Sequence, residues 1–564
     1  MAEVKPYSPK NSIRIVTAAS LFDGHDVSIN IMRRILQSSG AEVIHLGHDR
    51  SVEDVVNTAI QEDANAIAMT SYQGGHLEYF KYMFDLLQEM GGENIKIFGG
   101  GGGTILPVEI KELEDYGITK IYHPDDGRSM GLQGMINDLL KKCDYPIGNK
   151  VDHIVKEALD GLSKSIARLI SSAENFPTHF SKVLPLIEKK ITENNLPPVL
   201  GITGTGGAGK SSLVDELVRR FLTDHPDQKI GILSVDPTKR KSGGALLGDR
   251  IRMNSIQNTR VYMRSLATRQ SNLALSKHIS QALKILKAAS FDLIILETSG
   301  IGQSDTEILE HSDASLYVMT PEYGASTQLE KIDMLDFADL ISLNKLDKRG
   351  ALDALRDVKK QVQRNQNRWD ENLDNMPVFG TMASQFNDPG TNRLYRAIME
   401  TLMTKLKRKN ISFDSNRIEA DSEKNYIIPA NRTRYLSEIS ECVRDYNTWV
   451  KNQSDIADTL YSFDRTMKEI TQLNLNDSKD SLEVILKANK KVETNLDHDN
   501  WQAIKGWEEL KKRYLASDYV YQVRGKDIHV DTHVTSLSNQ KIPKVVTPNY
   551  RSWGDILRWI LQEN

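Results

Sequence analysis

A glycine-rich octapeptide places the strongest constraint on the fold of this 564-residue chain. GTGGAGKS, at residues 204–211, follows the strand-like run 198–204 and precedes a helix-like stretch. It matches G-x-x-x-x-G-K-[ST], in which small residues let backbone N–H groups curl around phosphate oxygens at the start of a helix. The motif predicts a nucleotide-binding loop in which Lys210 reaches the β- and γ-phosphates and Ser211 ligates Mg²⁺. We expect nucleotide contacts from Gly204, Gly206, Gly207, Ala208, Gly209, Lys210, Ser211 and Ser212.

Three acidic residues are placed to share the metal with Ser211. Asp236 and Glu297 each follow an apolar, strand-like run, and Asp249 lies between them in LLGDRIRM. Mg²⁺ prefers a few hard oxygen ligands together with waters and phosphate oxygens. The sequence therefore predicts a magnesium site formed by Ser211, Asp236, Asp249 and Glu297.

The tetrapeptide NKLD, at residues 344–347, follows another strand-like run, DLISL. A carboxylate at Asp347 can accept hydrogens from both N1 and N2 of guanine, a pair of donors that adenine lacks. Asn344 is expected to support the base and Lys345 to lie along its face. The order of phosphate loop, acidic strand end and NKLD favours GTP over ATP.

The segment ETSGIGQSD, at residues 297–305, follows the same acidic strand end. Gly300 lets a backbone N–H approach the γ-phosphate. Gln303 is a candidate, with Lys210, for a catalytic role by orienting water, although an exposed loop residue fits the sequence as well. Arg252 is expected to contact phosphate or a partner, with a solvated role equally compatible.

Between residues 13 and 143, short apolar runs alternate with amphipathic ones in five β/α repeats. This pattern predicts an α/β domain, residues 10–145, with a doubly wound, flavodoxin-like parallel sheet of strand order 2-1-3-4-5. The ligand crevice of such a sheet lies at the carboxyl ends of its first and third strands. A second β/α series predicts a P-loop domain at 150–412 with a helical N-terminal extension, and a helical linker follows at 413–525.

Asp23 and His25 lie in the loop after the first expected strand. A carboxylate two residues before a histidine can hold one ring nitrogen and leave the other to face a metal. Ser71 ends the third strand, across the same crevice. Gly99 and Gly100 begin a run of five glycines that leaves open backbone for a bulky ligand tail.

These residues resemble the D-x-H-x-x-G, S-x-L and glycine-pair motifs of base-off, His-on cobalamin domains. Ser28 departs from the last glycine of the first motif, and Gln73 departs from the leucine of the second. The resemblance implies that His25 ligates cobalt, with Asp23 behind it, and that Ser71, Gly99 and Gly100 contact the nucleotide tail of the cofactor.

The second domain resembles the G-protein chaperones of methylmalonyl-CoA mutase, which carry comparable VDP, GD-x-x-R-M and ET-x-G-x-GQ segments. A cobalamin domain followed by a G domain and a helical linker resembles the fused isobutyryl-CoA mutases over essentially the whole chain. The resemblance implies adenosylcobalamin, Mg²⁺ and GTP, a G domain that gates cofactor loading, a homodimer, and conversion of isobutyryl-CoA to n-butyryl-CoA.

In that family the chain continues into a barrel that binds acyl-CoA, whereas fewer than about forty residues follow Ile528 here and a barrel needs roughly 250. We therefore expect 526–564 to lead toward a barrel on a longer chain or a separate subunit, and this chain alone not to isomerise acyl-CoA. The last helix-like stretch, with Trp553, Ile556 and Leu557, is expected to need a partner.

Composition excludes several other classes. A net charge of −4 with 26% charged residues offers no basic footprint for nucleic acid, and no apolar run approaches the ~18 residues of a membrane span. Two cysteines make neither a disulfide framework nor a zinc site, and the N-terminus lacks the apolar core of a secretory signal, which favours a cytoplasmic protein. Two alternatives stay open: a corrinoid methyl carrier with a regulatory GTPase domain, and a GTPase with a degenerate first domain.

Overall fold

The computed structural model describes residues 4–193, 196–239, 241–269, 278–298, 305–323, 326–406, 435–473, 478–523 and 526–563. The chain divides into two compact units, Met1–Asn425 and Tyr426–Asn564. Within the described ranges, no helix combines the length and apolar character that crossing a bilayer requires.

The first sheet has the strand order β5-β4-β3-β1-β2-β8, all parallel, which confirms the predicted order 2-1-3-4-5 and adds one strand. Helices α2, α3 and α4 cover one face, and α1 and α5 cover the other. The elements are β1 (Arg14–Ser20), α1 (Val27–Ser38), β2 (Glu42–Arg50), α2 (Val52–Gln61), β3 (Ala66–Thr70), α3 (His76–Glu89), β4 (Lys96–Gly100), α4 (Pro107–Tyr116), β5 (Lys120–Tyr122) and α5 (Pro124–Cys143).

The second sheet has the order β13-β12-β11-β6-β10-β7-β9, also parallel. Its elements are β6 (Val199–Gly204), α9 (Lys210–Asp224), β7 (Ile230–Asp236), η2 (Asp249–Arg252), η3 (Ser255–Gln257), β9 (Val261–Ala267), α10 (Ile279–Ala288), β10 (Leu293–Glu297), η4 (Asp305–Glu310), β11 (Ala314–Met319), η5 (Ser326–Lys331), α11 (Met334–Phe337), β12 (Leu340–Asn344), α12 (Ala351–Asn365), η6 (Leu373–Asn375), β13 (Val378–Thr381) and α13 (Pro389–Leu406). The edge strand β9 is not predicted by the sequence pattern.

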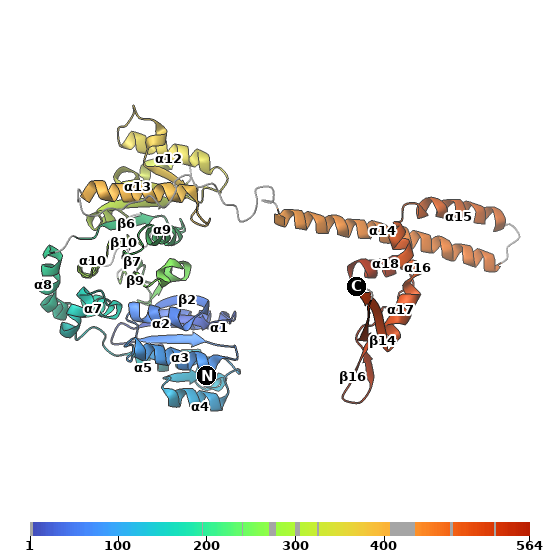
Figure 1. The fold of residues 1–564 in the computed structure, drawn as a ribbon, viewed down its shortest axis with the longest axis horizontal. Helices are drawn as coiled ribbons and strands as arrows, with labels where there is room; N and C mark the ends of the chain where they lie inside the picture. Colours follow the sequence, from blue (N-terminus) through green and yellow to red (C-terminus); the bar gives the residue numbers. More distant parts are fainter. Residues whose placement is uncertain are drawn as a thin grey trace. The chain divides into compact units, whose positions relative to one another are not determined.

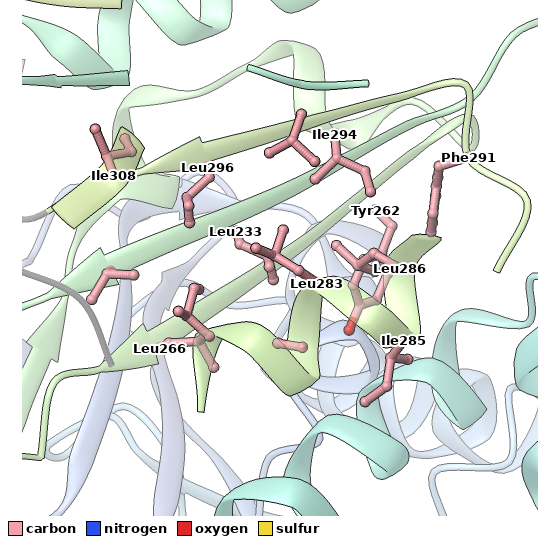
Figure 2. Packing of buried hydrophobic residues seen from close by; sticks show 14 of the residues in the cluster. Leu233, Tyr262, Leu266, Leu283, Ile285, Leu286, Phe291, Ile294, Leu296 and Ile308 are labelled. Atoms are coloured by element: carbon pink, nitrogen blue, oxygen red, sulfur yellow. The ribbon is translucent and has the colours of Figure 1, made fainter. Parts of the chain in front are cut away.

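The apolar core of the second sheet lies on both of its faces. Helices α9 and α13 pack on one face. The other is covered by α10, α11 and α12 and by the preceding helical segments η1 (Asp152–Ile154), α6 (Val155–Leu159), α7 (Ser163–Asn175) and α8 (Pro177–Glu193). Figure 2 shows Leu283 and Leu286 of α10 facing Leu233 and Tyr262 of the sheet. This packing anchors β7 and β10, whose ends carry Asp236 and Glu297.

Strand β8 (Ala245–Leu247) follows β7 in the chain but pairs with β2 of the first sheet, with Glu42 opposite Ala245 and Ile44 opposite Leu247. Leu247 is fully buried in the core of the first sheet. In Figure 1, β2 and α2 face the green part of the chain that contains β9. The two α/β domains therefore share a sheet and form one compact unit.

Buried ion pairs cross the same boundary. Glu42 accepts from Arg14 at 2.7 Å and from Arg269 at 2.8 Å, and Arg250 donates to Glu62 at 2.7 Å. Burial alone would raise the pKa of Glu42, but Arg269 and Arg14 hold it far below its ordinary value. Because the folded protein favours the charged form of Glu42 more strongly than the unfolded protein does, the pairs of Glu42 with Arg14 and Arg269 stabilise the folded protein above the ordinary pKa of glutamate.

The second unit is built around the long helix α14. Its elements are α14 (Tyr435–Leu473), α15 (Ser478–Glu493), α16 (His498–Lys505), α17 (Trp507–Leu515), β14 (Asp518–Val523), β15 (Lys526–Asp531), β16 (His533–Thr535), β17 (Lys541–Pro543) and α18 (Trp553–Gln562). The terminal helix α18 packs against α14, contrary to the expectation that it needs a partner. Leu557 is buried with Ala457 and Leu460 of α14. Trp553 stacks edge-on against Trp501, 5.2 Å between ring centroids.

Replacing Leu247 by Ala is expected to destabilise the first sheet even though the residue lies in the second β/α series. The cavity left in a buried core costs about 2–5 kcal/mol. Hydrogen exchange of β2 amides, with thermal unfolding alongside, measures the loss. Leu352→Ala on exposed α12 is the matched control, and unchanged β2 protection in Leu247→Ala would contradict the shared core.

Glu42→Gln is expected to lower the free energy of unfolding by up to about 3–5 kcal/mol at neutral pH, because the buried Arg14 and the partly buried Arg269 each lose one charged partner. The folded pKa of Glu42 lies below the ordinary 4.5, so wild type loses the same stabilisation as the pH falls below 4.5 and the difference between the proteins shrinks. Chemical unfolding at pH 7 and near pH 3.5 checks this. Glu188→Gln is the control, since its pair with Lys284 is half-exposed; a difference that is constant with pH would count against the ion-pair explanation.

Candidate functional site

The phosphate loop has the backbone that its glycines predict. Gly207 and Gly209 have φ of +75° and +88°, in the left-handed region that other residues rarely adopt. At Gly204 a Cβ atom would lie 1.9 Å from the carbonyl oxygen of Val318. Lys210 opens α9, and its Nζ donates to the carbonyl oxygens of Gly204 at 3.0 Å and Thr205 at 3.3 Å. The loop thus joins β6 to the N-terminus of α9, where anions are stabilised.

Two of the predicted carboxylates converge on Ser211. Its Oγ lies 2.8 Å from Asp249 Oδ1 and 3.0 Å from Glu297 Oε1. One hydroxyl carries one hydrogen, so it can satisfy only one of these acceptors at a time. Glu297 Oε2 is buried and has no hydrogen-bond partner. Oxygen atoms left in this state suit a hard cation such as Mg²⁺.

The electrostatics of the cluster support the same interpretation. Burial and the nearby Asp249 raise the pKa of Glu297 well above its ordinary value. Burial and Asp249 also raise the pKa of Asp236, whose Oδ2 accepts from the Gly248 N–H at 3.2 Å. Among the described residues no three Asp, Glu, His or Cys side chains would hold a metal ion by themselves. A magnesium ion here would therefore draw ligands from phosphate oxygens and water as well as Ser211.

The NKLD segment lies beside the phosphate loop. Asn344 ends β12, donates to the carbonyl oxygen of Ala208 at 2.8 Å and accepts from the N–H of Ala383 at 3.1 Å. Lys345 has φ of +62° and donates to the carbonyl oxygen of Gly207 at 2.7 Å. Asp347 is exposed, where its carboxylate can meet a base. The segment after β13, which holds Asn344 in place, was not predicted from the sequence. Its Ala383 acts through a backbone N–H, which no side-chain pattern indicates.

The other residues predicted to contact nucleotide differ from one another in solvent exposure. Gly206 is exposed on the loop and Ser212 is half-buried in the first turn of α9. Arg252 is exposed on η2, whereas its neighbour Arg250 is buried and pairs with Glu62. Gly300 and Gln303 lie outside the described residues.

The loop after β1 holds His25 in an orientation set by Asp23. The buried Asp23 Oδ1 lies 2.8 Å from His25 Nδ1 and accepts from the His25 N–H at 2.9 Å, while Oδ2 accepts from the Tyr72 N–H at 2.7 Å. Burial raises the pKa of Asp23, but these hydrogen bonds outweigh it and hold the pKa below its usual range. The imidazole is 76% exposed, so its Nε2 is open to a ligand from solvent.

A cavity of about 270 Å³ opens beside this loop, between α1, α5 and the ends of β3 and β4. Its lining includes Ser28, Thr70, Tyr72 and the backbone of Gly99–Gly102. The Thr70 hydroxyl is buried with no partner. A crevice lined mostly by apolar side chains, with bare glycine backbone and one unpaired hydroxyl among them, fits a large ligand that carries a few polar groups.

Ser71 does not line this crevice, and Gly99 lines it through its backbone alone. The buried Ser71 hydroxyl accepts from Ser20 at 2.9 Å, and Ser71 is absent from the cavity lining. A Cβ at Gly99 would lie 2.5 Å from the ring of Phe80, on the α3 side, whereas one at Gly100 would lie 3.5 Å from the Tyr122 carbonyl oxygen. Thr70, next to the predicted Ser71, lines the crevice with its hydroxyl but was not predicted from the sequence.

Two family profiles match the chain. Residues 166–473, more than half of the chain, match the profile described as "Methylmalonyl Co-A mutase-associated GTPase MeaB". Residues 13–123 match the profile described as "B12 binding domain". The two matches correspond to the second and first β/α series.

Curated relatives match both parts together. The chain is 51% identical to a fused isobutyryl-CoA mutase of Geobacillus kaustophilus over 99% of this chain and 52% of the relative. It is 48% identical to one of Cupriavidus metallidurans, over 99% of this chain and 50% of the relative. A protein of Pyrococcus horikoshii named as a GTPase is 33% identical over 44% of this chain and 77% of its own length. The chain thus spans about half the length of the fused relatives it matches.

Proposed function

Because the chain belongs to the methylmalonyl-CoA mutase-associated GTPase family and also carries a B12 binding domain, we propose that it holds cobalamin through His25 and hydrolyses GTP. In this proposal it is the cofactor-carrying part of an adenosylcobalamin-dependent acyl-CoA mutase, and its G domain gates cofactor loading. The observation that carries the proposal is the Asp23–His25 contact of 2.8 Å beside an exposed imidazole and an open crevice.

Each residue near the crevice has a part in this proposal. Asp23 fixes the tautomer of His25 by holding Nδ1, which keeps Nε2 available for cobalt. Gly100 and its glycine neighbours admit the nucleotide tail, Thr70 offers it a hydroxyl, and Ser71 holds the loop in place. Adenosylcobalamin, when bound, supplies a cobalt–carbon bond whose homolytic cleavage initiates a 1,2-rearrangement.

The G domain binds GTP with Mg²⁺ in this proposal. The phosphate loop and Lys210 hold the phosphates, Ser211 ligates Mg²⁺, and Asp249, Glu297 and Asp236 surround the ion directly or through water. Asp347 selects guanine, while Asn344 and Lys345 brace the phosphate loop from the base side. Gln303 orients the attacking water. The backbone N–H of Gly300 contacts the γ-phosphate, so the domain responds to its presence.

The acyl-CoA chemistry requires a partner. The fused relatives are about twice as long as this chain, and the proposed partner is an acyl-CoA-binding barrel on the same longer chain or on a separate subunit. The chain by itself binds both ligands, forms a homodimer in the cytoplasm and does not isomerise isobutyryl-CoA to n-butyryl-CoA.

His25→Ala is expected to abolish the absorption change that marks histidine ligation when cobalamin is added, because no other group offers an imidazole at that loop. Asp23→Asn is expected to weaken cobalamin binding by about 10–100-fold, the usual effect of losing a metal ligand's support. Titration by absorption spectroscopy measures both. His153→Ala, at an exposed site, is the control.

A wild-type titration without a spectral change would refute cobalamin binding and leave a GTPase with a degenerate first domain. Tight binding of methylcobalamin, with adenosylcobalamin rejected, would instead support a corrinoid methyl carrier. Comparing the two alkyl forms in one titration series separates these outcomes.

Asp347→Asn is expected to weaken GTP binding by at least about 10-fold, since the carboxylate can accept from both guanine N1 and N2 and a charge-assisted contact contributes roughly 1.5–3 kcal/mol. The carboxamide pairs instead with xanthine, whose N1–H donates and whose C2 carbonyl accepts, so binding of xanthosine triphosphate should strengthen. Isothermal titration with the two nucleotides measures the exchange. Asp353→Asn, exposed on α12, should leave both affinities unchanged; equal weakening of both nucleotides by Asp347→Asn would contradict base recognition.

A further inference from the structure

One short segment, residues 245–252, connects the edge of the first sheet to the proposed magnesium site. At one end β8 extends the first sheet beside β2. Immediately after it, Gly248 donates to Asp236 at 3.2 Å and Asp249 accepts from the Ser211 hydroxyl at 2.8 Å. Any rearrangement of Asp249 when a magnesium ion and phosphates arrive therefore acts on a peptide that is hydrogen-bonded into the neighbouring sheet.

The next residues of the segment lie against the carboxyl end of β2. Arg50 Nε donates to the carbonyl oxygen of Leu46 at 2.7 Å, and its Nη2 lies 3.4 Å from the carbonyl oxygen of Ile251. Gly47 has φ of +86°, and a Cβ there would lie 2.9 Å from Ile251 Cδ1. One guanidinium thus spans β2 and η2 at a point where the Ile251 side chain lies against the backbone of Gly47.

From β2 a single hydrogen bond reaches the His25 loop. Asp49, next to Arg50, accepts from the Phe22 N–H at 2.7 Å through Oδ1. Both residues have positive φ, +57° at Asp49 and +62° at Phe22, a conformation that costs free energy in non-glycine residues and needs support. Phe22 directly precedes Asp23, so this bond sets where the chain enters the loop that orients His25.

The contact of η2 and η3 with α2 and the end of β2 is not fully packed. A cavity of about 70 Å³ lies there, lined by residues including Arg50, Gln61, Arg250 and Ile256. Close-packed contacts resist displacement, whereas a void beside η2 leaves it room for a second position.

We propose that Arg50 and Asp49 are positioning residues that couple the occupancy of the nucleotide site to the position of the His25 loop, through residues 245–252. This inference rests on the proposed function of both sites. Neither residue touches nucleotide or cobalamin; Arg50 follows the displacement of Ile251, and Asp49 passes it to Phe22. Coupling of this kind is reciprocal, so cobalamin must change nucleotide affinity by the same factor.

The test compares cobalamin dissociation constants with Mg²⁺–GDP and with Mg²⁺ and a non-hydrolysable GTP analogue. In wild type the two constants are expected to differ by about 5-fold or more, the lower end of typical coupling. Asp49→Gly keeps the positive φ but removes the acceptor, and the ratio should fall to near one. Asp49→Asn keeps both the φ tolerance and an acceptor, so it should retain the wild-type ratio.

Arg50→Ala is expected to reduce the ratio in the same way, with Arg34→Ala, exposed on α1, as the matched control. GTP hydrolysis without cobalamin should be unchanged in Asp49→Gly. Wild-type ratios in both Asp49→Gly and Arg50→Ala would overturn the proposal, as would a ratio of one in wild type.

Hydrogen exchange on the cobalamin-free protein distinguishes failure of this inference from failure of the proposed function. On adding Mg²⁺ with the GTP analogue, the Phe22 amide should change its exchange rate in wild type and Asp49→Asn but not in Asp49→Gly. If cobalamin never binds while this pattern holds, the proposed function fails and the coupling stands. Identical Phe22 exchange in both nucleotide states overturns the coupling whatever cobalamin does.

Discussion

The pairing of β8 with β2 is the constraint on which the first unit depends. Backbone N–H and C=O groups at a sheet edge must find partners, and the second β/α series satisfies those of β2 by sending residues 245–247 across the domain boundary. The chain must then return within a few residues to place Asp249 beside Ser211. The edge of the first sheet and the proposed magnesium site are thereby joined by one short stretch of backbone.

Buried charge strengthens that boundary and makes it specific. Glu42 and Glu62 of the first domain pair with Arg269 and Arg250 of the second; the Glu62–Arg250 pair is fully buried, whereas the Arg269 side chain is 21% exposed. A buried pair of this kind contributes little over an apolar contact, but breaking it leaves an uncompensated charge. These ion pairs therefore raise the free energy of other packings of the two domains more than they lower the free energy of this one.

The two sites illustrate opposite uses of a carboxylate. Asp23 is buried, yet three hydrogen bonds keep it charged, so it can hold the imidazole of His25 in one orientation. Glu297 is buried among other acids, and without a cation its charged form is disfavoured. The hydrogen bonds of Asp23 come from the protein itself, whereas Glu297 Oε2 is buried with no hydrogen-bond partner among the described residues.

Local sequence patterns determined the fold of each α/β domain and most of the candidate site. The glycines of 204–209 and the NKLD tetrapeptide act through backbone conformation or side-chain type at fixed spacing. The β/α alternation predicts a parallel sheet, and its five repeats favour the flavodoxin-like strand order 2-1-3-4-5. Because this information is local, it can be recognised in the sequence alone.

Only the tertiary structure could decide the rest. The short run Ala245–Leu247 has no strand signal of its own and becomes a strand because β2 offers an unpaired edge. Thr70 rather than Ser71 faces the crevice because alternate residues of a strand point to opposite faces, and a motif one residue long cannot specify which. Arg50, Asp49 and Arg250 acquire their partners from residues far away in sequence, and contacts between distant residues are a property of packing that no local pattern contains.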